Sequence, residues 1–143
     1  MQDNIKVTGE VNIFINGELK KHIPNLVVTA GKAFILSRMK EATSDVMSHI
    51  AVGTGTNTAA AGNTTLQTEV KRVALNAVPT ISGNSIIYEA TFGTNVPDSA
   101  QTITEAGIFN DDTVGNMLAR TVFSAVNKAT TDIMTIQWTI NLS

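Results

Sequence analysis

The sequence predicts a mainly β fold: an antiparallel β-sandwich or flattened barrel with one short α-helix at about residues 30–42. Apolar and polar residues alternate with a period of two in several short segments, as in half-buried strands. Clusters of Asn, Asp, Gly and Ser separate these segments at short intervals. No repeat of roughly 20–50 residues and no heptad is present, which argues against solenoids and coiled coils. The 143-residue length fits a single domain, residues 1–143, with residues 1–9 as an N-terminal arm.

Composition narrows the classes of function. The chain has no cysteine, which excludes disulfides, thiol nucleophiles and cysteine-zinc sites. A formal net charge of −2 and a charged content of 15% argue against a nucleic-acid partner, because such proteins carry a basic patch. No apolar run approaches the ~18 residues of a membrane span, and the first residues lack a signal pattern. We therefore expect no membrane partner and synthesis in a cytoplasm.

The N-terminal part predicts a hairpin. Asn16 and Gly17 tolerate the positive φ angles of a type I′ turn, which is the strongest short hairpin signal. A return strand follows at Glu18–Ile23 and ends before Pro24. The first strand has apolar residues at odd positions: Ile5, Val7, Val11, Ile13 and Ile15.

The predicted helix covers Ala30–Ala42, and Thr29 is expected to cap its first turn through the hydroxyl group. A short strand at His49–Val52 comes next, and the loop Gly53–Thr65 follows it. This loop lacks the Gly-Lys-Ser/Thr end of a phosphate-binding loop. The helix residues expected to face the core are Ala33, Phe34, Leu36 and Met39.

Residues 66–72 suggest a single turn in which Glu69 and Arg72 are spaced to pair. A second hairpin is predicted from residues 73–81 and 85–92. The last strand, Asp132–Ser143, shows the clearest alternation in the chain, with apolar residues at five even positions. The aromatic and aliphatic residues expected to pack together in the core are Phe92, Phe109, Phe123, Ile136, Trp138 and Ile140.

The central hairpin pairs Ile103–Phe109 with Met117–Phe123 across a polar turn. Gly107 interrupts the first strand and suggests a bulge or a close backbone neighbour. Glu105 and Arg120 lie symmetrically about the turn and could form an ion pair. As a surface pair they would contribute only about 0.2–1 kcal/mol, so we expect them to set the register at most.

Residues arranged for chemistry are scarce. His22 and His49 lie in unrelated segments without a second ligand at metal-binding spacing. Asp111 and Asp112 are adjacent, but they occupy a turn, where aspartate is common. No nucleophile elbow or calcium loop is present. We therefore predict no catalytic residues, no cofactor and no metal site.

Six blocks of the sequence form a further pattern: Asn25-Leu-Val-x-x-x-Gly31, Ile50-Ala-Val-Gly-Thr-Gly-Thr56, Thr65-Leu-x-x-Glu69-x-x-Arg72, Ile103-x-Glu-Ala-Gly-Ile-Phe109, Met117-Leu-Ala-Arg-Thr-Val-Phe123 and Ile136-x-Trp-Thr-Ile140. In this order, these blocks resemble small virion proteins of tailed bacteriophages. Similar blocks occur in tail-collar and tail-fibre attachment modules and in stand-alone head or tail accessory proteins. The resemblance covers roughly residues 25–142 and implies a fold and a setting without a site. Fibre proteins continue into a shaft and receptor-binding tip, whereas this chain stops at Ser143.

The resemblance and the scarcity of chemistry favour a non-enzymatic virion structural protein, made in the host bacterial cytoplasm and located in the virion. Within this class we prefer a capsid cement or decoration protein, because a compact chain without a shaft suits the bridging of capsid subunits. A tail, collar or fibre-attachment component is the alternative. A carbohydrate- or receptor-binding module would require exposed aromatic platforms, and a small hydrolase would require acid–base or nucleophilic groups.

The expected partners are copies of the chain itself, with a trimer as the leading arrangement, and other phage capsid or tail proteins. Open antiparallel sheets have edge strands that another chain can cover. We expect the arm Met1–Gly9 and the loop Thr54–Thr65 to make these contacts. A loop of this length in a compact fold usually has a function, although disorder is the alternative. The contact residues predicted are Ile5, Val7, Thr54, Thr56, Asn57 and Thr58.

Overall fold

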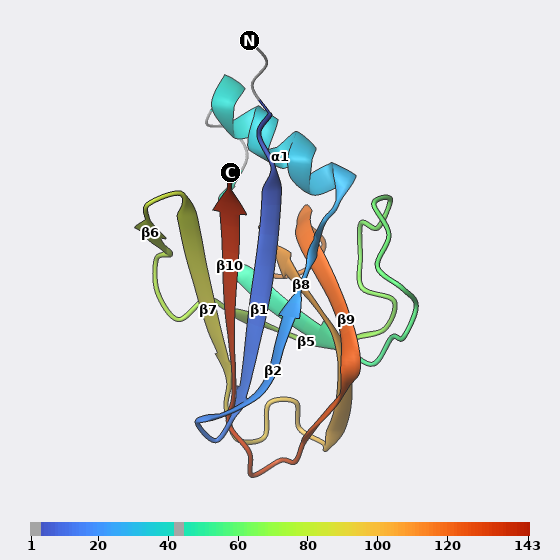
Figure 1. The fold of residues 1–143 in the computed structure, drawn as a ribbon. Coiled ribbons are helices and arrows are strands. Elements are labelled where there is room, and N and C mark those ends of the chain that lie inside the picture. The colour runs from blue at the N-terminus through green and yellow to red at the C-terminus, as the bar shows by residue number, and fades with distance from the viewer. Residues whose placement is uncertain (1–3, 42–44) are drawn as a thin grey trace.

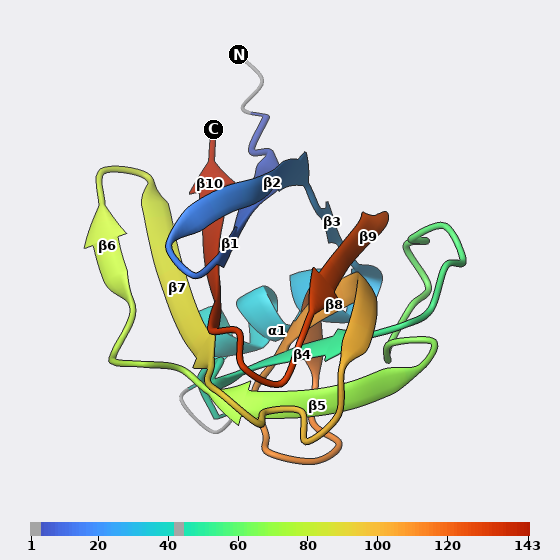
Figure 2. The same ribbon diagram turned by 90° about the horizontal axis from the view of Figure 1, so that it is seen from below.

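The computed structural model describes residues 4–41 and 45–143. It contains two antiparallel five-stranded sheets and, among the described residues, one short helix, which confirms the predicted mainly β sandwich (Figure 1). Sheet A consists, in spatial order, of β2 (Glu18–Pro24), β1 (Val7–Ile15), β10 (Met134–Leu142), β7 (Ser85–Phe92) and β6 (Thr80–Ser82). Sheet B consists of β3 (Leu26–Val27), β9 (Met117–Lys128), β8 (Gln101–Phe109), β4 (His49–Gly53) and β5 (Glu69–Ala74). The helix α1 (Thr29–Lys40) lies across one end of the sandwich, the end at which β1 begins and β10 ends (Figures 1 and 2).

The first hairpin is confirmed. Asn16 and Gly17 have φ angles of 51° and 83°, as a type I′ turn requires. The predicted arm over residues 1–9 is wrong from Lys6 onward, because this part of the chain pairs with the C-terminal strand. Lys6 and Ser143 exchange two backbone hydrogen bonds of 2.8 and 3.0 Å, and Val7 is the first residue of β1. Residues 1–3 of the predicted arm lie outside the described residues.

The space between the sheets is filled by the predicted core, with one exception. Trp138, Phe92 and Phe123 are buried in one cluster together with Ile136 and Ile140. Phe109 belongs instead to a second cluster on the opposite face of sheet B, where its neighbours are Val28, Ala51, Leu66 and Met117.

A β-bulge explains the position of Phe109. The pairing of β8 with β9 shifts register between Ile103 and Glu105, so the alternation of β8 changes phase there. Ile103 faces the main core before the bulge, and Ala106 and Ile108 face it afterwards. Glu105 and Phe109 are consequently directed to the other face of sheet B. Gly107 lies on this face as well, and its close neighbours are side chains of Leu66, Phe109 and Met117 rather than backbone.

The helix differs from the prediction in its limits and in its buried side. It begins at Thr29, ends at Lys40, and has Val28 at the cap position without a side-chain cap, so the expected cap by the Thr29 hydroxyl is wrong. The residues facing the sandwich are Gly31, Phe34 and Ile35, whereas Ala33 is exposed and the exposed fractions of Leu36 and Met39 are 64% and 79%. A Cβ atom on Gly31 would lie 2.1 Å from the Leu118 carbonyl oxygen, so this side of α1 rests directly on the β9 backbone. Ala42, the last residue of the predicted helix, lies outside the described residues.

The segment after the long loop also differs from the prediction. Residues 69–74 form strand β5, which pairs with β4, where a single turn was expected. The predicted strand over residues 73–81 is divided, since β5 belongs to sheet B and β6 to sheet A. The second hairpin therefore consists of the three-residue β6 and the eight-residue β7.

Candidate functional site

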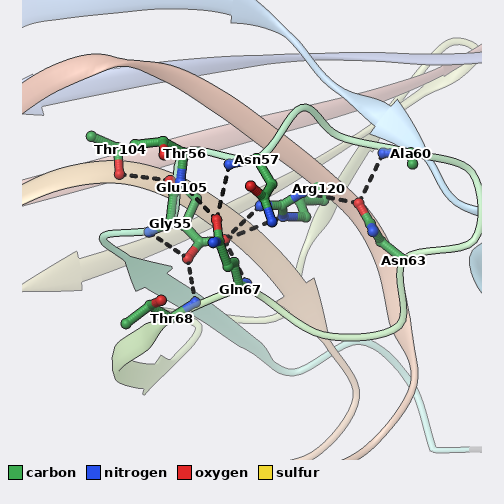
Figure 3. Close-up of polar contacts among 10 residues, drawn as sticks. All are labelled: Gly55, Thr56, Asn57, Ala60, Asn63, Gln67, Thr68, Thr104, Glu105 and Arg120. Atoms are coloured by element: carbon green, nitrogen blue, oxygen red, sulfur yellow. Dashed lines mark hydrogen bonds and ion pairs between the residues drawn. The ribbon is translucent and has the colours of Figure 1, made fainter.

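The most elaborate polar arrangement is a buried ion pair under the loop Gly53–Thr68, which we call the anchored loop (Figure 3). Glu105 on β8 is 0% exposed and Arg120 on β9 is 1% exposed. The Nε and Nη2 groups of Arg120 donate to Glu105 Oε1 at 3.2 and 2.9 Å. The predicted pairing is confirmed, but the expectation of a surface pair is wrong. The reason is the bulge in β8, which directs Glu105 to the face of sheet B that the anchored loop covers.

Glu105 fastens both ends of the anchored loop. Its Oε2 atom accepts hydrogen bonds from the backbone N–H groups of Gly55 at 2.8 Å and Thr68 at 2.7 Å. Its Oε1 atom accepts one from the N–H of Gln67 at 2.9 Å. Together with the two bonds from Arg120, both carboxylate oxygens are occupied, so this group is built to hold the loop rather than to accept a proton from a substrate.

The environment of Glu105 has opposing effects on its pKa. Burial would raise the pKa of this carboxyl group. Hydrogen bonds from the N–H groups of Thr68 and Gln67, from the Arg120 side chain and from the N–H of Gly55 outweigh burial and hold the pKa below its ordinary value. Glu105 is therefore ionised at neutral pH, as the ion pair requires.

Further hydrogen bonds order the middle of the anchored loop. The side-chain oxygen of Gln67 accepts from the N–H groups of Thr56 and Asn57, each at 2.9 Å. Asn63 Oδ1 accepts from Arg120 Nη1 and from the N–H of Ala60, again at 2.9 Å each. The loop is thus tied to its own subunit at its ends and in its middle, which favours the ordered interpretation over disorder.

Two glycines allow the loop to approach Glu105. A Cβ atom on Gly53 would lie 2.3 Å from the Thr68 carbonyl oxygen, and one on Gly55 would lie 2.4 Å from Glu105 Oε2. This role of the two glycines was not predicted from the sequence, and neither were the roles of Gln67 and Asn63. The Gly-x-Gly spacing was the available signal, because glycine often marks a close approach of backbone to another group.

The residues predicted to contact other subunits fall into two regions. Thr56, Asn57 and Thr58 are three consecutive exposed residues of the anchored loop, which we call its tip, and Thr54 is half-buried beside Thr68. A shallow cleft of about 300 Å³ separates this tip from the β2–β3 junction, and Thr56 and Thr58 line it. The other two predicted residues lie in and before β1: Val7 packs against the core of its own subunit, and Ile5 is 78% exposed.

Other groups that could support chemistry remain apart in the described structure. The His22 ring contacts Asn12 and Glu10, whereas the His49 ring contacts Ser48. Within residues 4–41 and 45–143, no three His, Cys, Asp or Glu side chains gather closely enough to hold a metal ion. No helix in this part of the chain is long and apolar enough to cross a membrane.

Aromatic side chains offer no platform at the surface. The chain has one Trp, one Tyr and five Phe, all within the described residues, and each is buried or half-buried. Sugar-binding modules stack sugar rings on exposed aromatic faces, so this surface lacks the usual means of recognising a carbohydrate.

No protein-family model matches the chain, and comparisons with curated proteins and with solved structures found no significant match.

Proposed function

We propose that the chain is a non-enzymatic structural protein of a tailed-bacteriophage virion, and that within this class it is a capsid cement or decoration protein. It would bind copies of itself and the capsid surface. The tip of the anchored loop, Thr56–Thr58, is the proposed contact with the capsid.

One observation carries the proposal. Four of the blocks that resemble phage virion proteins supply the parts of the anchored loop and its support. Residues 50–56 and 65–72 provide its two ends with the adjoining strands β4 and β5, and residues 103–109 and 117–123 provide Glu105 and Arg120. The resembling residues thus build a framework for holding a surface loop, which is a task of a binding protein.

The exposed part of the loop suits a protein surface as partner. Its tip presents two threonines and one asparagine, which are uncharged groups that donate and accept hydrogen bonds. Because the loop is already ordered in the free subunit, binding does not require the cost of about 1–2 kcal/mol per residue for fixing a mobile backbone. Polar contacts of this kind are common at the rim of protein interfaces.

The same resemblance supports a tail, collar or fibre-attachment component as the second candidate. The two candidate functions predict different copy numbers in the particle. A decoration protein covers the capsid and should approach the copy number of the major capsid protein. A tail component should be present in few copies. Quantitative mass spectrometry of purified particles distinguishes them. Absence of the chain from the particles would contradict both.

A variant of the loop tests the contact itself. Replacing Thr56 and Thr58 by arginine should abolish binding to particles that lack the protein, because two large charged side chains would be placed at the interface. Thr94 is exposed in the loop between β7 and β8, so Thr94→Arg is a matched control that should bind normally. Equal binding of both variants would exclude the loop tip as the contact.

A further inference from the structure

An apolar groove of about 350 Å³ opens at the end of the sandwich where α1 crosses it. Phe34 and Ile35 of α1 line this groove together with Ile81 of β6 and Ile86 of β7. Leu142 of β10, the strand next to β7, also lines it. Ile81 and Leu142 are 75% and 47% exposed. Exposed aliphatic side chains around a concave surface mark a binding site for apolar groups.

The strand beside this groove has an open edge. β6 pairs with β7 on one side only and forms the outer limit of sheet A, as Figures 1 and 2 show. Ser82 and Ser85 close its two-residue turn. Because hydrogen-bonded and non-hydrogen-bonded pairs alternate along an antiparallel ladder, the N–H and C=O of Ile81 are directed away from β7. They are available to another chain.

The other edge strands are better protected. β2 carries Glu18, Lys20 and Lys21, and β5 carries Glu69, Lys71 and Arg72, and charged residues on an edge discourage pairing. The third, β3, is two residues long and its Val27 is buried. In β6 all three residues are uncharged and exposed. Pro79, just before β6, has no N–H group, so the open edge accepts only a short segment.

The size of the groove determines the kind of occupant. A large aliphatic side chain contributes roughly 60–120 Å² of apolar area. With two strongly exposed residues, the groove offers about a few hundred Å², well below the ~800 Å² per partner of a standard interface. A rigid face of a second subunit would be poorly matched to it. An extended segment with one apolar side chain matches both the groove and the edge.

Within the described part of the chain, residues 4–6 are such a segment. Ile5 is 78% exposed, lies between Asn4 and Lys6, and precedes β1 at the same end of the molecule as α1. Isoleucine also favours extended backbone. The other exposed aliphatic residues of the described structure lie outside the groove in less suitable places. Leu36 and Met39 belong to the helix, and Leu19 belongs to β2, which is already paired with β1. The rest lie in turns or connections: Val46, Val78, Val114 and Ile133.

We infer that the open edge of β6 and the adjacent groove receive residues 4–6 of a neighbouring copy, with Ile5 inserted in the groove. The inference rests on the proposed function, since it requires that copies meet in an assembly. The donating segment and the accepting groove are different surfaces, so the contact is head-to-tail and closes into a ring when the rotation between copies allows it. A trimer is one such ring.

Solution mass tests this contact. Sedimentation velocity over a concentration series should give a multiple of 15.2 kDa for the unmodified protein. Ile5→Asp removes the apolar side chain that is inserted, and Ile81→Lys blocks the groove that receives it. Each change should weaken association at least tenfold. Both positions are exposed, so the fold should persist, which circular dichroism checks. Val114→Asp, a matched change at an exposed position in the β8–β9 turn, should associate like the unmodified protein.

Mixing the two variants separates this arrangement from other modes of association. The Ile81→Lys variant keeps Ile5, and the Ile5→Asp variant keeps an intact groove. An equimolar mixture should therefore form mixed pairs, one copy of each variant, that neither variant can form alone. Dissociation by Ile81→Lys but not by Ile5→Asp would overturn the inference in favour of direct pairing between two β6 strands. An oligomer unaffected by either variant, or a monomer at every concentration, would also overturn it. Presence of the protein in purified particles tests the proposed function separately.

Discussion

At the scale of single residues, Glu105 is the group on which the proposed contact surface depends. Burying an ion pair costs several kcal/mol per charge, and this cost is offset only when the remaining hydrogen-bonding positions are filled. Glu105 meets this condition with three backbone N–H donors and two bonds from Arg120. The pair therefore determines where the anchored loop lies more than it adds net stability.

Removing one member of the pair should be costly. Glu105→Gln leaves Arg120 buried without a counter-charge, and we expect the free energy of unfolding to fall by about 3–5 kcal/mol. Glu105→Gln combined with Arg120→Met should cost less than the sum of the two single changes, because no unpaired charge remains. Urea denaturation measures all three. Glu10→Gln, at an exposed carboxylate, is the control, and a loss as small as that of the control would contradict the anchoring role.

The lowered pKa of Glu105 also predicts a dependence of stability on pH. The folded-state pKa lies below the unfolded value of about 4.3. As the pH falls through this range, the folded protein therefore binds fewer protons than the unfolded protein does. The stabilisation is complete above the unfolded pKa and is lost as the pH falls through the folded pKa. Thermal unfolding between pH 7 and about pH 3 should show a shallower loss in Glu105→Gln than in the unmodified protein. Parallel curves would show that Glu105 titrates normally.

At the scale of secondary structure, the regular strands follow from the sequence and the irregular ones do not. β1 and β10 alternate without interruption, so their inward residues are predicted correctly. These residues are Val11, Ile13 and Ile15 in β1 and Met134, Ile136, Trp138 and Ile140 in β10. In β8 the bulge beside Glu105 reverses the alternation, and a period-two pattern contains no information about a bulge before the pairing is known. This accounts for the errors at Glu105 and Phe109.

The buried side of α1 was mispredicted because its closest contact is made by a residue without a side chain. Gly31 lies against the Leu118 carbonyl, so Gly31→Ala should destabilise the protein by about 1–3 kcal/mol. Helix propensity alone predicts the opposite sign, since alanine is favoured over glycine by about 1 kcal/mol. Thermal denaturation decides between them. Ala33→Gly, at an exposed helix position, is the control and should lose only the propensity contribution.

The last core strand gives a further test. Trp138→Ala should lower the free energy of unfolding by about 3–5 kcal/mol, because it leaves a large cavity between the sheets. The indole N–H of Trp138 has no hydrogen-bond partner in the described structure. Trp138→Phe should therefore cost less than Trp138→Ala, because the smaller ring leaves only a small cavity and no hydrogen bond is lost. Equal losses for both variants in denaturant titrations would show that the indole makes a specific contact.

At the scale of the whole molecule, the two proposed contacts lie in different places. The anchored loop projects from the side of the sandwich, whereas β1 begins at the end crossed by α1 (Figure 1). Ile5 directly precedes β1, and residues of α1 line the apolar groove. This separation would allow a subunit to bind its copies and the capsid at the same time. The sequence predicted the loop as a contact from its length, but the hydrogen bonds that order it join residues up to 57 positions apart, which no local pattern can show.

Hydrogen exchange at the tip of the anchored loop, compared between the free protein and purified particles, tests the central proposal most directly. The N–H groups of Gly55, Gln67 and Thr68, which donate to Glu105, should exchange slowly in both states and serve as internal references. The exposed Thr58 should exchange rapidly in the free protein and at least tenfold more slowly in particles, because the contact excludes water from the tip. Equal and rapid exchange of Thr58 in both states would contradict the proposal that this loop binds the capsid.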